Sequence, residues 1–107
     1  MTRGRREAQD EQGRPFTAQR DGDAWLVAAV ANSFSTLSPR ERAVLLAAAR
    51  GAEDKEIAEK LGCSLSTVRT LWHRTYRKTR ELSRRMLIAR AWKEACRMAS
   101  VVDLSTT

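Results

Sequence analysis

The stretch that decides the fold is LSPRERAVLLAAARGAEDKEIAEKLGCSLSTVRTLWHRTYRKT, which spans residues 37–79 of the chain. Apolar side chains recur in it at three- and four-residue spacing, which is typical of amphipathic helices. Ser38, Pro39 and Glu41 form a helix-start signal, because serine caps, proline suits the first turn and glutamate completes a capping box. The pattern predicts three helices within this stretch.

The second and third of these helices are joined by a short turn that contains glycine. We expect them over residues 54–61 and 65–78, with Gly62 at positive φ in the turn and Ser64 as the cap of the later helix. Ala58 is small enough to let the two helices cross closely. This plan is that of a helix-turn-helix, whose second helix enters the major groove of DNA.

The flanking segments complete the prediction of an all-α fold, since no segment has the alternation of a strand. An accessory helix is expected within residues 21–36, where Asp23 caps and Trp25 and Val30 belong to an apolar stripe. Residues 1–20 are polar and are predicted as a disordered tail, with a basic arm that reaches DNA as the alternative. A long last helix runs from near Ser83 to about Ala99. The domains are therefore a tail (1–20), an accessory helix (21–36), a helix-turn-helix domain (37–100) and a flexible C-terminus (101–107).

The positive charge of the chain is concentrated in its C-terminal part. The net charge is +7, and residues 63–107 alone carry ten Lys or Arg against three Asp or Glu, while residues 1–62 are balanced. A concentrated basic surface indicates an anionic partner, and with a helix-turn-helix that partner is double-stranded DNA.

The same residues resemble the DNA-binding domain of LuxR/GerE-type regulators. The resemblance covers residues 37–79 and extends more weakly to residues 83–89. The matching positions are Leu37–Arg42, Val44–Leu45, Gly51, Lys55–Ala58, Leu61–Gly62, Thr67–Thr70, Arg77–Lys78, Ser83–Arg84 and Leu87–Ala89.

This resemblance implies a four-helix domain in which Leu65 to Lys78 form the recognition helix, here with an extra N-terminal helix and an extended C-terminal one. It implies base contacts from Arg69, Thr70 and His73. It implies contacts with the DNA backbone from Lys55, Thr67, Arg74, Arg77 and Lys78. The chemistry agrees, because an arginine such as Arg69 binds guanine through two hydrogen bonds.

Four positions depart from the family pattern. Glu53 replaces a small capping residue, Leu71 a polar or histidine position, and Thr75 an apolar one. The segment Arg80-Glu81-Leu82 lacks the glycine that usually follows the recognition helix. We expect helix boundaries and fine recognition to be affected here.

An enzyme is not expected. The sequence has no paired-carboxylate pocket, no Ser/His/Asp set and no glycine-rich phosphate loop, and we expect no cofactor. Cys63, Cys96 and His73 are too far apart for a metal site. No apolar run is long enough to span a membrane, so we expect a cytoplasmic protein associated with the nucleoid.

A homodimer is expected, because one recognition helix contacts only a few base pairs. The predicted interface lies on the last helix at Ile88, Ala91, Trp92 and Ala95, and the alternative is the first helix around Trp25 and Val30. Two other functions compete with DNA regulation. One is a protein-interaction module, such as an anti-activator or co-regulator, and the other is a factor like sigma region 4 that contacts promoter and RNA polymerase.

Overall fold

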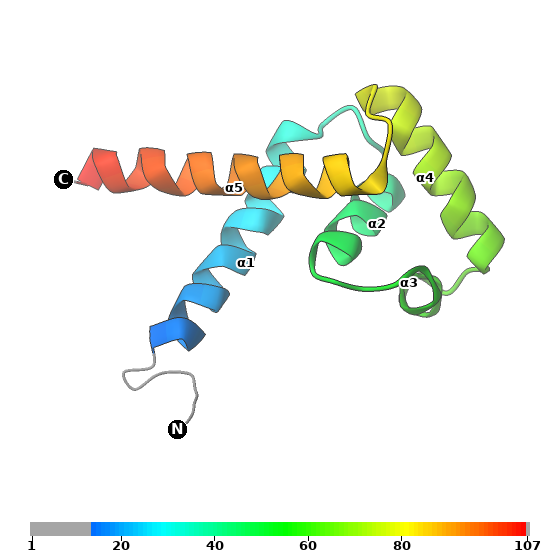
Figure 1. Cartoon of the computed structure of the whole chain (residues 1–107), viewed down its shortest axis with the longest axis horizontal. Helices are drawn as coiled ribbons and strands as arrows, with labels where there is room; N and C mark the ends of the chain where they lie inside the picture. Colours follow the sequence, from blue (N-terminus) through cyan, green and yellow to red (C-terminus); the bar gives the residue numbers. More distant parts are fainter. Residues whose placement is uncertain (1–13, 107) are drawn as a thin grey trace.

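The computed structural model describes residues 14–106, with side chains over residues 22–100. Within that range the chain forms helices and no strand, which confirms the predicted all-α fold. Figure 1 shows the helices, whose bounds are α1 (Arg14–Ser33), α2 (Pro39–Ala49), α3 (Asp54–Leu61), α4 (Leu65–Thr79) and α5 (Arg84–Thr106).

The start signals predicted at Ser38 and Ser64 cap α2 and α4 as expected. The backbone N–H of Glu41 donates to Ser38 Oγ at 3.2 Å, and the Ser38 N–H donates to Glu41 Oε1 at 2.8 Å. This reciprocal pair confirms the capping box of α2. At α4 the Thr67 N–H donates to Ser64 Oγ at 3.1 Å. At α3 the first helical residue is Asp54, because Glu53 occupies the cap position.

The turns between these helices use left-handed backbone. Gly51 after α2 has φ of 98°, and Gly62 between α3 and α4 has φ of 66°. Arg80, at the end of α4, is also left-handed, with φ 61° and ψ 24°. Helix α4 thus ends at Thr79 although no glycine follows it, and Arg80 adopts a conformation that favours glycine.

The two outer helices are longer than predicted. Residues 14–20, assigned to the tail, lie in α1, and residues 101–106, assigned to a flexible end, lie in α5. Asp23 does not cap a helix, because α1 begins before it and Asp23 lies in the helix interior. Its carboxylate pairs instead with Arg50 through contacts of 2.7 and 2.9 Å. The rest of the predicted tail, residues 1–13, lies outside the described residues.

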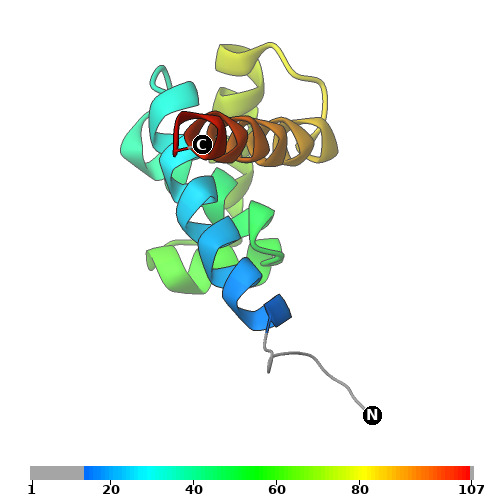
Figure 2. The ribbon, with the colours of Figure 1, turned by 90° about the vertical axis from the view of Figure 1, so that its left-hand side faces the viewer.

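Helix α2 contacts each of the other four described helices, and α1 crosses α5 (Figures 1 and 2). One continuous core joins Leu26 and Phe34 of α1 to Leu45 of α2, Ile57 of α3 and Leu87 of α5. The accessory helix is therefore part of the same folded unit as the helix-turn-helix. None of the described helices combines the length and apolar composition of a membrane span.

We predict that Arg80→Gly stabilises the protein, because glycine relieves the left-handed strain at this position. The free energy of unfolding should rise by about 0.5–1 kcal/mol, the strain relief being partly offset by the added freedom of the unfolded chain. Ala89→Gly, at an exposed position inside α5, is the control and should cost about 1 kcal/mol. Urea denaturation measures both, and a loss of stability in Arg80→Gly would contradict this account of the turn.

Candidate nucleic-acid interface

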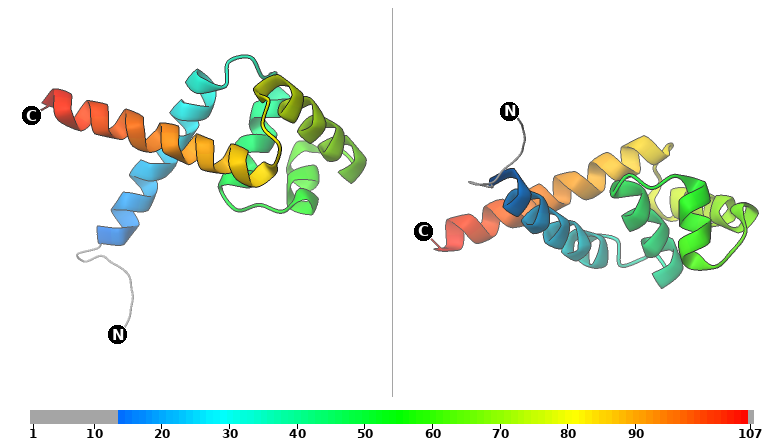
Figure 3. Two further views of the ribbon diagram at one scale, coloured as in Figure 1. Left: turned by 45° about the horizontal axis from the view of Figure 1, so that its top comes forward. Right: turned by 90° about the horizontal axis from the view of Figure 1, so that it is seen from below.

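One face of α4 is open to solvent and carries the residues expected to read DNA. Arg69, Thr70, His73 and Arg77 are exposed and follow one another at short helical spacing, which places them on the same side of the helix. Arg74 is exposed on the flank of this face. Figure 3 shows α4 at the edge of the molecule, so that its outer side is unobstructed by the other described helices.

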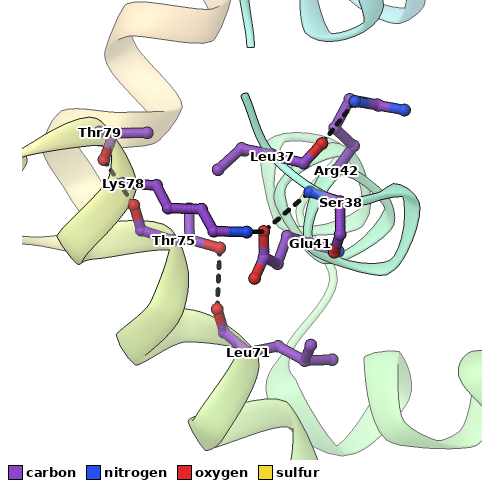
Figure 4. Close-up of polar contacts among 8 residues, drawn as sticks. All are labelled: Leu37, Ser38, Glu41, Arg42, Leu71, Thr75, Lys78 and Thr79. Carbon is purple, nitrogen blue, oxygen red and sulfur yellow. Dashed lines mark hydrogen bonds and ion pairs between the residues drawn. The ribbon is translucent and has the colours of Figure 1, made fainter. Parts of the chain in front are cut away.

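The opposite face of α4 is fixed in the core. Its buried side chains are Val68, Leu71, Trp72 and Thr75. The departures at Leu71 and Thr75 therefore lie inside the protein and leave the exposed face of α4 unchanged. Thr75 satisfies its hydroxyl within the helix, where Oγ1 donates to the Leu71 carbonyl at 2.8 Å (Figure 4).

The N-terminal turn of α4 and the first turn of α3 bring two more predicted residues to the surface. Thr67 is half-buried, and its hydroxyl lies 3.0 Å from that of Ser64. Lys55 is exposed near the start of α3, which packs against α4. These positions border the N-terminal end of the recognition helix.

Lys78 differs from the other residues expected to contact phosphates. Its ammonium donates to Glu41 Oε1 at 2.8 Å (Figure 4), and Glu41 is only 2% exposed. Lys78 and Arg77 are neighbours in sequence, but successive helical residues point about 100° apart, so Arg77 faces solvent while Lys78 faces α2. The structure thus separates two residues that the sequence analysis grouped together.

The same Glu41 oxygen accepts from Lys78 and from the Ser38 backbone. Burial raises the pKa of this carboxyl group, but the hydrogen bonds from Lys78 and from Ser38 outweigh burial, and the net pKa lies below its ordinary value of 4.5. The carboxylate is therefore charged at neutral pH. It joins the start of α2 to the last turn of α4.

A second polar cluster fixes α4 from its other side, and the sequence analysis did not find it. Asp54 Oδ1 accepts from Trp72 Nε1 at 3.1 Å and forms an ion pair with Arg84. The Arg84 guanidinium lies over the Trp72 ring, 4.6 Å from its centroid. Trp72 is a core residue, and the three side chains connect the starts of α3 and α5 to the middle of α4.

The residues expected at a dimer interface lie largely inside the monomer. Ala91 and Ala95 are at most 2% exposed, because α1 packs along this side of α5. Val30, on the alternative interface, is 3% exposed. Ile88 is half-buried, and Trp92 remains 37% exposed while its Nε1 donates to the Ala49 carbonyl at 3.1 Å. The small side chains of Ala91 and Ala95 allow α1 to pack closely against α5.

Comparison with known proteins agrees with this architecture. The family model of bacterial regulatory proteins of the luxR family matches residues 35–91, which is more than half of the chain. No curated protein and no solved structure gives a significant match. The chain therefore belongs to the luxR family of bacterial regulatory proteins, a family of DNA-binding transcription regulators rather than of enzymes.

We predict that Glu41 makes the stability of the protein sensitive to acid. Its pKa is lowered on folding, so its contribution is fully present above its unfolded pKa of 4.5 and is lost as the pH falls through the lowered folded value. In denaturant unfolding, the difference in unfolding free energy between the wild type and Glu41→Gln should therefore stay constant from neutral pH down to about pH 4.5 and shrink as the pH falls below that value. Glutamine keeps an acceptor for the Ser38 N–H, so the comparison isolates the charge. A difference that also stays constant below about pH 4.5 would show that Glu41 has no such role.

Proposed function

We propose that this regulator binds double-stranded DNA with α4 in the major groove. Arg69, Thr70 and His73 contact base edges, and Arg69 pairs with a guanine through two hydrogen bonds. Arg77, Arg74, Lys55 and Thr67 contact the phosphate backbone on either side. The observation that supports this proposal best is the contrast between the two faces of α4. One face is packed in the core, and the other is exposed and basic.

The position of Lys78 modifies the set of phosphate contacts. Its ammonium would have to leave a buried carboxylate to reach DNA, and uncovering that charge is costly. We therefore assign Lys78 to positioning α4. Affinity then depends on the other basic residues, of which Arg77 lies where the helix leaves the groove.

Binding as a dimer is part of the proposal, because a single helix contacts too few base pairs to select a site. A two-fold dimer presents two recognition helices, about one DNA turn apart. Of the four residues predicted at this interface, Ile88 and the exposed edge of Trp92 are open to a partner copy, whereas Ala91 and Ala95 are buried. The competing functions rest on the departures at Leu71 and Thr75 and on the long last helix. The burial of Leu71 and Thr75 weakens the first part of that argument, whereas the length of α5 leaves the second part in place.

Selection of binding sites from random DNA tests this proposal, with the wild type, Arg69→Ala and Arg77→Ala compared side by side. The wild type should enrich a palindrome with half-site centres about 10 base pairs apart. Arg69→Ala should lose preference at one G·C pair per half-site and about 1–3 kcal/mol per contact. Arg77→Ala should keep the wild-type motif and flatten the salt dependence of affinity by about one unit per protomer.

Two outcomes would contradict the proposal. If the wild type enriches no motif, DNA reading through α4 is excluded. If Arg77→Ala changes the motif while Arg69→Ala does not, the division between base and phosphate contacts is reversed. Lys93→Ala, which removes an exposed cation from α5, is the matched control and should leave both the motif and the salt dependence unchanged.

A further inference from the structure

The seam between α1 and α2 holds an apolar groove of about 240 Å³ on the outside of the molecule. Val27 and Ala31 line it from α1, and Pro39, Ala43 and Leu46 line it from α2, with Arg42 at its side. Val27 is 40% exposed, and Ala31 and Pro39 are exposed as well. Ala43 and Leu46 are half-buried, so the two helices share an open apolar depression.

The groove lies away from the surface proposed to bind DNA. Pro39, Ala43 and Leu46 share one side of α2, whereas Glu41, Leu45 and Ala48 share the buried side, from which Glu41 pairs with Lys78 of α4. Figure 1 shows α1 and α4 on opposite sides of the molecule. A partner in the groove would therefore leave the outer face of α4 open.

The charges around the groove indicate which partner fits. The Arg42 guanidinium donates to the backbone carbonyl of Leu37 at 2.6 Å, a neutral acceptor that leaves its positive charge in place. Arg40 is exposed in the same turn of α2, and among the described residues no carboxylate lines the groove. A second copy that docked here by a two-fold contact would bring Arg40 and Arg42 of both chains to one interface, which places like charges together.

We propose that this groove binds an amphipathic helix of a partner protein, with an apolar face flanked by carboxylates. Two packed helices leave a furrow into which a third helix fits with its side chains at three- and four-residue spacing. Leucine-sized side chains of that helix fill the space between Val27 and Leu46, and a carboxylate pairs with Arg42. The inference does not depend on DNA binding, since none of its residues belongs to the exposed face of α4.

The test is a display library of helical peptides that keep leucines on one face and vary the flanking positions among Glu, Gln and Lys. The wild-type protein should enrich peptides with Glu beside the leucines. Val27→Glu should weaken the best peptide about tenfold or more, because a carboxylate replaces an apolar contact and repels the acidic flanks. Ala89→Glu, at an exposed position on α5, is the matched control and should bind the peptide as the wild type does.

The charge is tested separately at Arg42. Arg42→Gln should remove the preference for Glu, and Arg42→Lys, which keeps the charge, should retain it. The melting temperature of each variant shows that it folds. The proposal is overturned if the peptides that the wild type enriches show no preference for Glu. It is also overturned if the wild type enriches peptides no more strongly than Val27→Glu does. Concentration-dependent dimerisation that Val27→Glu abolishes in light scattering would also overturn it, since the occupant would then be a second copy.

Discussion

The ion pair between Glu41 and Lys78 is the contact on which the orientation of α4 depends. Its carboxylate is almost fully buried and also closes the capping box of α2, so one side chain begins one helix and holds the end of another. Removing a partner from a pair of this kind leaves a buried charge without compensation, which is why the geometry tolerates little movement. The contacts of the inner face of α4 therefore determine the direction in which its exposed face points.

Further contacts around this pair hold α4 in its orientation. Because α2 contacts every other described helix, it fixes α4 through Glu41 and also supports α1 and α5. The cluster of Asp54, Trp72 and Arg84 then holds the middle of α4 against the starts of α3 and α5. Two polar contacts and an apolar core thus orient the recognition helix from three sides. The accessory α1 covers the side of α5 where the sequence predicts a partner copy, which limits a dimer interface there.

The parts that the sequence predicted well are those determined by local chemistry. The capping box at Ser38, the turn at Gly62 and the cap at Ser64 follow from a few neighbouring residues, and each is confirmed. The family followed from the same stretch. Long-range pairings were not predictable, because nothing near Lys78 in the sequence indicates a carboxylate thirty-seven positions earlier. The burial of Ala91 depends in the same way on where α1 docks, and helix period alone cannot distinguish an intramolecular seam from a dimer seam.

A double-mutant cycle on Glu41→Gln and Lys78→Met measures the central contact directly. The free energy of unfolding is determined by urea denaturation for the wild type, both single variants and the double variant at neutral pH. If the pair holds α4 to α2, the two changes should be coupled by about 1–2 kcal/mol, with the double variant more stable than the sum of the single losses predicts. Losses that add within about 0.5 kcal/mol would show that the two side chains act independently, and would contradict this account.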